Sequence, residues 1–292
     1  MRGSQVTSKM KPAPPETAGP PDDFIRASSG VLGLDLFRFE EAFLRKAIAG
    51  RLLANEMPSL PEYADFLAES PEEAEEFFRS LHVNHSSFFR NPLTFAVIEQ
   101  LVLPGLVEAK KKSGGEIRVW SAGCASGQEA WSIAMLLEEL TSPQGERVSW
   151  RIFATDLAEP DQARVGVYCA GDVGNVRARH LRDYFFRQAD SYVIVPGLRS
   201  QVDFSVHDLL DDSSASPAAG IFGDFDLILC CNVLIYYRAD ARQSILEKLW
   251  HAISPGGFFV TGEAERTIVS GHQGLRAVAP PAAVFQTDSR WL

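Results

Sequence analysis

The sequence is short of cations and of long apolar runs. Its 28 Lys and Arg residues stand against 38 Asp and Glu, so the formal net charge is −10 over 292 residues. Because nucleic-acid binding requires a basic face, this deficit argues against a nucleic-acid partner. No apolar run reaches the roughly 20 residues of a membrane-spanning helix, and the first residues lack a signal-peptide pattern. We therefore expect no membrane insertion.

Metal-binding and disulfide patterns are also missing. The four cysteines, Cys124, Cys169, Cys230 and Cys231, show no CxxC spacing. This distribution is typical of free thiols in a reducing compartment, so we expect a cytoplasmic protein. The six histidines show no HExxH or similar spacing, and the sequence predicts no metal site.

Composition divides the chain into three parts. Residues 1–28 are rich in proline and small polar residues, which predicts a disordered leader. Residues 29–95 show helical periodicity, with helix starts after Ser59 and Ser70, and predict a small helical domain. A further helix is expected at about residues 93–112, and the rest of the third part, residues 96–292, alternates strand-like and helical segments. That alternation predicts an α/β domain with a largely parallel sheet and helices on both faces.

The expected strands of this third part follow from apolar runs bounded by turn residues. They fall at 117–122, 150–155, 202–206, 225–232 and 257–262. Residues 182–204 interrupt the alternation and predict a small antiparallel subdomain. The segments 275–278 and 283–287 predict a closing hairpin.

A glycine-containing turn joins the first strand of the α/β domain to a helix. Gly123 and Gly127 follow the strand, and glycine there lets the backbone approach a ligand at the helix N-terminus. The spacing is GxxxG and not GxGxxG, which weighs against a nicotinamide or flavin cofactor. Two glycines can also occur in any such turn, so this segment alone decides little.

Polar residues follow two further strands. Asp156 ends the second strand, where a carboxylate can accept bonds from both ribose hydroxyls of a nucleoside. The alternative is that Asp156 caps the next helix. Asn232 and Tyr236 lie at the carboxyl end of the 225–232 strand, the edge at which ligands of open α/β sheets bind. Tyr236 could instead be a packing residue.

Four motifs in order along the chain closely resemble those of the CheR family of chemotaxis receptor methyltransferases. The resemblance runs from about residue 30 to the C-terminus. The motifs are Asn84-x-Ser86-x-Phe88-Phe89-Arg90, Arg118-Val119-Trp120-Ser121-Ala122-Gly123-Cys124-x-x-Gly127-x-Glu129, Ala154-Thr155-Asp156 and Cys230-x-Asn232-Val233-x-Ile235-Tyr236.

The resemblance implies a Rossmann-like class I methyltransferase with a mixed seven-stranded sheet, using S-adenosylmethionine. It implies a monomer that methylates glutamate side chains on the cytoplasmic helical domain of a chemoreceptor. Arg90 and Tyr236 are expected to act in methyl transfer. The positions that match the family's cofactor contacts are Asn84, Ser86, Arg90, Ala122, Gly123, Glu129, Asp156, Asp208, Leu209, Cys231 and Asn232.

The chain departs from the family pattern at three of these positions. Cys231 stands where arginine is usual, Asp208 where asparagine is common, and Ser86 where threonine is usual. The missing cation at position 231 leaves open a receptor-docking or cofactor-sensing module with weak or no turnover. A small-molecule enzyme of the same fold is a further alternative, against which the helical domain and the antiparallel insertion argue.

Overall fold

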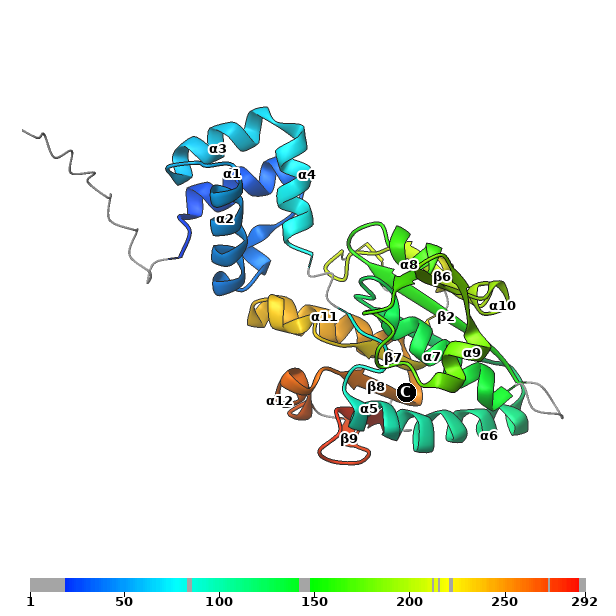
Figure 1. Ribbon diagram of the computed structural model, residues 1–292. Helices are drawn as coiled ribbons and strands as arrows, with labels where there is room; N and C mark the ends of the chain where they lie inside the picture. Colours follow the sequence, from blue (N-terminus) through cyan, green and yellow to red (C-terminus); the bar gives the residue numbers. More distant parts are fainter. Residues whose placement is uncertain are drawn as a thin grey trace, which may run out of the picture.

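The computed structural model describes residues 19–82, 86–141, 148–211, 213–214, 216–220, 223–272 and 274–288. A small helical bundle lies at one end of a larger α/β body (Figure 1). The bundle consists of α1 (Asp22–Leu32), the 3-10 turn η1 (Leu36–Arg38), α2 (Glu41–Ala54), α3 (Leu60–Glu69) and α4 (Pro71–Ser80). Since α1 begins at Asp22, inside the range expected to be a disordered leader, we propose that the helical domain begins there and not at residue 29.

Both predicted helix starts in the bundle are confirmed. The Ser59 hydroxyl accepts a bond from the backbone N–H of Glu62, and the Ser70 hydroxyl accepts one from that of Glu73. Each serine is followed by proline within the first turn, where the missing N–H costs nothing.

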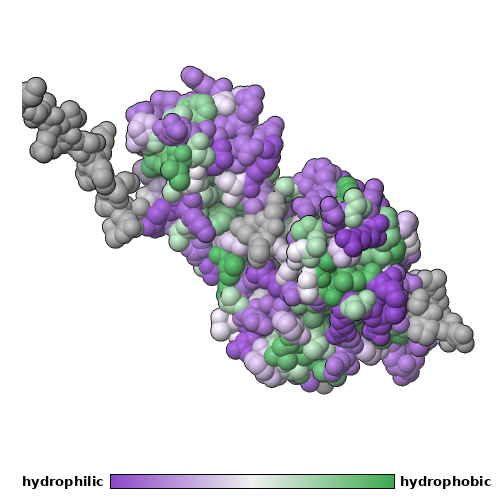
Figure 2. All heavy atoms as spheres, viewed as in Figure 1, coloured by the Kyte–Doolittle hydropathy of each residue, from purple (hydrophilic) through white to green (hydrophobic). Residues whose placement is uncertain are grey.

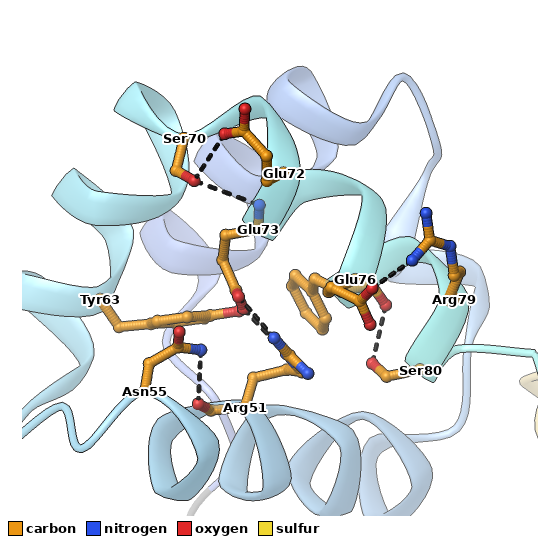
Figure 3. A network of polar contacts seen from close by, with 10 residues as sticks. Arg51, Asn55, Tyr63, Ser70, Glu72, Glu73, Glu76, Arg79 and Ser80 are labelled. Atoms are coloured by element: carbon orange, nitrogen blue, oxygen red, sulfur yellow. Dashed lines mark hydrogen bonds and ion pairs between the residues drawn. The ribbon is translucent and has the colours of Figure 1, made fainter.

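A buried ion pair ties three helices of the bundle together (Figure 3). Arg51 of α2 donates from Nε to the Glu73 carboxylate of α4 at 2.8 Å, and the Tyr63 hydroxyl of α3 donates to the same carboxylate at 2.7 Å. Glu73 is only 4% exposed. Although burial alone would raise the pKa of Glu73, these bonds hold it below its ordinary value.

The α/β body contains the predicted seven-stranded sheet. Its order is β6-β2-β1-β7-β8-β10-β9. Neighbouring strands from β6 through β8 pair in parallel, whereas β10 runs antiparallel to both β8 and β9. The closing hairpin is thereby confirmed as the last two strands. The bounds are β1 (Glu116–Ala122), β2 (Ser149–Asp156), β6 (Val202–Val206), β7 (Phe225–Cys230), β8 (Ile253–Thr261), β9 (Leu275–Ala277) and β10 (Val284–Thr287).

Helices and short turns cover both faces of the sheet. One face, which includes Val119 and Ile152, packs against the helices that precede and follow β1; the other, which includes Trp120 and Ile228, packs against α11 and the bundle. The elements are α5 (Pro92–Val97), the π-helical η2 (Ile98–Val102), α6 (Leu103–Ser113), α7 (Gln128–Thr141), α8 (Asp161–Val165), α9 (Ala178–Tyr184), α10 (Pro196–Arg199), η3 (Ala218–Gly220), η4 (Leu234–Tyr236), α11 (Ala239–Ala252), η5 (Glu263–Glu265) and α12 (Arg266–Ser270).

The helix that runs through Pro92–Ser113 bears on the domain boundary. By length and composition alone it is apolar enough to cross a membrane, but Ile98, Val102 and Leu103 are fully buried in the α/β core. Phe88, just before it, packs on rings of the same body. The expected boundary at residues 95–96 falls inside this helix. We propose that the boundary lies before Ser86 instead.

The small antiparallel sheet is present but differs from the expected range of 182–204. Its order is β3-β5-β4, formed by Val167–Cys169, Ser191–Ile194 and Phe185–Gln188. The strand β3 precedes the expected range, and with three residues it is too short for a sequence pattern to reveal. Residues 202–206 belong instead to the main sheet, parallel to β2.

Candidate active site

A cleft opens at the carboxyl ends of β1, β2, β6 and β7. It encloses about 1100 Å³, open solvent included, which is enough for a nucleoside-sized ligand. Both domains contribute to its wall. The lining residues include Phe39, Leu81, His82, Ser86, Ser87, Arg90, Gly123, Ala125, Glu129, Asp156, His207, Leu209, Cys231, Asn232, Val233, Tyr236 and Tyr237.

The glycine turn after β1 forms the floor of the cleft. The backbone N–H groups of Gly123 and Cys124 both donate to the Thr155 carbonyl, at 2.8 and 2.9 Å, which fastens the turn to the end of β2. Gly123 has φ +78°, and a Cβ added there would lie 2.3 Å from Cγ2 of Val233. Only glycine therefore fits between this turn and the opposite wall.

Asp156 stands at the end of β2 beside this turn. Its Oδ2 accepts a bond from the backbone N–H of Ala125 at 2.8 Å, which engages one of its two oxygens. The helix-cap interpretation is wrong, because α8 begins at Asp161 with Pro160 at its N-cap. The carboxylate lines the cleft instead, where a sugar could meet it.

Glu129, in the first turn of α7, meets Cys231 across the cleft. The Ser121 hydroxyl donates to Glu129 Oε1 at 2.7 Å, and the Cys231 thiol, which lies near this carboxylate, donates to the Val260 carbonyl at 3.9 Å. Burial raises the pKa of Glu129 above its ordinary value. Burial and the charge of Glu129 raise the pKa of Cys231 well above the usual range, so Cys231 stays a neutral thiol. A cation on a bound ligand would balance the Glu129 carboxylate.

Asn232 is held in an unusual backbone conformation by Glu265. Its φ is +61°, in the left-handed region. The buried Glu265 carboxylate accepts bonds from the backbone N–H of Asn232 at 2.7 Å and from that of Gly262 at 2.9 Å. The Oδ1 of Asn232 is buried and has no hydrogen-bond partner among the described residues. Because such an oxygen is costly to leave unpaired, it fits a ligand that donates a hydrogen bond.

A histidine that lines the cleft, His207, directly follows the end of β6. His207 packs edge-on against Trp120, and burial lowers its pKa, so the ring is neutral at pH 7. Its Nε2 is buried and lacks a hydrogen-bond partner within the described part of the chain. The next residue, Asp208, does not line the cleft; its Oδ1 accepts a bond from the Leu210 N–H, whereas Leu209 does line it.

The structure brings most of the sequence-predicted residues to this one cleft, namely Ser86, Arg90, Gly123, Glu129, Asp156, Leu209, Cys231, Asn232 and Tyr236. Ala122 is fully buried at the end of β1 and, like Asp208, is adjacent to lining residues without lining the cleft. Asn84 lies outside the described residues. Within the described ranges, no three His, Cys, Asp or Glu side chains are grouped as a metal site would require.

Sequence reasoning missed several lining residues. Phe39 and His82 come from the helical domain, far from the motifs, so no local pattern connected them to the cleft. His207 adjoins the predicted pair at 208–209, and its position at a strand end was the one available signal. The tertiary fold, and not spacing in the sequence, brings these side chains to the site.

The residues present fit S-adenosylmethionine. Asp156 would accept hydrogen bonds from the sugar hydroxyls, and Glu129 and Asn232 Oδ1 would accept them from the ammonium of the amino-acid part. In the sheet, β10 lies between β8 and β9 and runs antiparallel to both. This strand order and the cleft are those of a class I S-adenosylmethionine-dependent methyltransferase.

Comparison with known proteins identifies the family. The model of the CheR methyltransferase S-adenosylmethionine-binding domain matches residues 84–279. The chemotaxis protein methyltransferase of Listeria monocytogenes is 32% identical over 255 residues, which cover 86% of this chain and 92% of that protein. Chemotaxis protein methyltransferase 1 of Pseudomonas aeruginosa is 32% identical over 64% of this chain and 67% of its own length. The Escherichia coli protein is 31% identical over 65% of this chain and 63% of its own length. The chain belongs to the CheR methyltransferase family.

Proposed function

We propose that the protein transfers a methyl group from S-adenosylmethionine to glutamate side chains of a chemoreceptor. The names of its relatives support this substrate, and the cleft supports the chemistry. The observation on which the proposal chiefly depends is the joint wall of the cleft. Phe39 and His82 of the helical domain line it together with residues from the strand ends, so a protein that docks on the bundle reaches the site.

The surface of the bundle is compatible with a polar partner. On the face drawn in Figure 2, hydrophilic residues cover most of the helical domain, with one hydrophobic patch among them. A receptor's helical cytoplasmic region would present charged and polar side chains to such a surface. The proposal places the enzyme in the cytoplasm, acting as a monomer.

Methylation of a carboxylate places modest demands on the protein. The side chain of glutamate has an ordinary pKa near 4.3, so at neutral pH it is already an anionic nucleophile and needs no general base. The bound cofactor supplies an electrophilic methyl on a sulfonium. Alignment of the nucleophile with that methyl, and exclusion of water, are then the main tasks, and positioning can lower a barrier by about 7–11 kcal/mol.

The chain's own residues fit these tasks. We assign Asn84, Ser86, Ala122, Gly123, Glu129, Asp156, Asp208, Leu209, Cys231 and Asn232 to cofactor binding, with Ala122 and Asp208 supporting the adjacent lining residues. Arg90 contacts the cofactor and guides the substrate carboxylate. Its contact with the carboxylate must be loose, because strong pairing in the ground state would slow transfer. Tyr236 shapes the wall beside the methyl.

The test is to incubate the protein with radiolabelled S-adenosylmethionine and a chemoreceptor cytoplasmic fragment and to measure base-labile methyl esters. We expect ester formation by the wild type and a sharp loss in Arg90→Ala. An Arg199→Ala variant, which removes an exposed arginine outside the cleft, serves as the control and should retain activity. If the wild type binds S-adenosylhomocysteine but forms no ester, the receptor-docking or cofactor-sensing alternative replaces this proposal.

A further inference from the structure

The helical domain is fastened by its backbone to one wall of the cleft. The N–H of Glu40 donates to the Tyr236 carbonyl at 2.8 Å, and the N–H of Arg238 donates to the Arg38 carbonyl at 2.8 Å. Between them, Phe39 and Tyr237 form an isolated antiparallel bridge. The segment before α2 and the turn η4 therefore behave as a two-stranded contact across the domain boundary.

Aromatic side chains extend this contact to the cleft. The ring of Phe43, on α2, lies 4.8 Å from that of Tyr236, and the ring of Phe39 lies 4.9 Å from that of Tyr237. Phe39 and Phe43 also stack on each other, with centroids 5.9 Å apart. Tyr236 is half-buried and lines the cleft, and its ring packs against the Phe43 ring of the helical domain.

An ion pair closes the same joint. Arg242 of α11 donates to Glu40 Oε1 at 2.6 Å and also to the Tyr237 carbonyl. Backbone hydrogen bonds, ring contacts and an ion pair thus join the helical domain to η4 and the residues that follow it. The matched family region begins at residue 84, so Phe39 and Phe43 lie outside it.

We propose that Phe43 is a positioning residue for methyl transfer, which acts by holding the ring of Tyr236 in place against the cleft. The proposal rests on the role given to Tyr236 in the proposed function. Because alignment governs the rate of this reaction, a ring free to turn would lower the fraction of productive complexes without weakening cofactor binding. Aromatic pairs of this kind typically contribute the equivalent of about a two- to tenfold change in rate or population.

Kinetics provide the first test. In Phe43→Ala, kcat for methyl transfer to the receptor fragment should fall by about two- to tenfold, whereas KM and the affinity for S-adenosylhomocysteine, measured by calorimetry, stay unchanged. Phe43→Tyr, which keeps the ring, should restore kcat. Phe66→Ala, which removes another half-buried phenylalanine of the bundle, should leave kcat unchanged.

A double-mutant cycle tests the path of the effect. If Phe43 acts through Tyr236, Phe43→Ala should lower kcat no further in a Tyr236→Ala background. An equal loss in both backgrounds, or wild-type kcat in Phe43→Ala, would overturn the inference while leaving the proposed function intact. Failure of the wild type to form ester would instead reject the proposed function.

The phenol of Tyr236 offers a measurement that needs no turnover. Burial raises its pKa, with Arg90 and Glu265 as the charged groups that act on it. Its titration can be followed as the absorbance difference between each protein and its Tyr236→Phe counterpart. Phe43→Ala should move the pKa down toward 10.0 as the ring becomes exposed, and Phe66→Ala should not. An unchanged titration in Phe43→Ala would contradict the inference whether or not the enzyme is active.

Discussion

Gly123 provides the sharpest test of the cleft's geometry. Replacing it with alanine adds a Cβ at φ +78°, 2.3 Å from Cγ2 of Val233. An L-residue in the left-handed region costs about 1–2 kcal/mol, and forcing extra volume into a packed wall costs about 1–3 kcal/mol. Together these terms predict a loss of about 2–5 kcal/mol, shared between stability and cofactor binding, because Val233 must move and it adjoins Asn232.

The matched control is Gly33→Ala. Gly33 has φ +63° at the C-terminus of α1, and a Cβ there would meet nothing within 4 Å. Thermal unfolding should show a smaller loss in this variant, and calorimetry with S-adenosylhomocysteine should show wild-type affinity. For Gly123→Ala we expect the affinity to fall at least about tenfold, which corresponds to 1.4 kcal/mol. Wild-type affinity in Gly123→Ala would refute the close approach of turn and wall.

Three further predictions concern charged groups. Asp156→Ala should weaken S-adenosylhomocysteine binding by about 1–3 kcal/mol in calorimetry, since the sugar hydroxyls lose their acceptor; wild-type affinity would refute that placement. Glu129→Gln should raise the melting temperature of the ligand-free protein at pH 7 yet weaken cofactor binding. Because the pKa of Glu129 is raised in the folded state, its negative charge destabilises the folded protein as the pH rises above the ordinary value of 4.5. The gain in melting temperature of Glu129→Gln should therefore vanish below pH 4.5. Glu73 has a lowered pKa, so its contribution to the stability of the fold is present at neutral pH and is lost as the pH falls below 4.5. Arg51→Met leaves the buried Glu73 carboxylate without its cation and should lower the free energy of unfolding by about 3–5 kcal/mol. An unchanged midpoint of chemical unfolding would contradict this.

The sequence sufficed for the parts of the fold that depend on local pattern. The parallel strands and the closing hairpin were predictable because apolar runs and turn residues mark them directly. The strand β3 was not, because three residues carry no periodicity. The boundary expected at residues 95–96 falls inside the helix that Pro92 begins, at a position that tolerates a missing N–H, and we propose the earlier boundary for that reason.

In the candidate site, too, local pattern predicts some residues and the tertiary fold determines the others. Asp156 and Asn232 were predictable from their place at strand ends, since parallel strands bring their carboxyl ends to one edge. The contribution of Phe39 and Phe43 was not, because it depends on how the bundle docks on η4. The interaction of Cys231, which follows β7, with Glu129 in the first turn of α7 likewise depends on the tertiary fold.

A crystal structure of the protein soaked with S-adenosylhomocysteine would test the central claim most directly. The account predicts the ligand in the cleft, with its ribose on Asp156, its amino group near Glu129 and Asn232, and its sulfur facing Tyr236. A ligand bound elsewhere, or a cleft that stays closed to it at saturating concentration, would contradict the account.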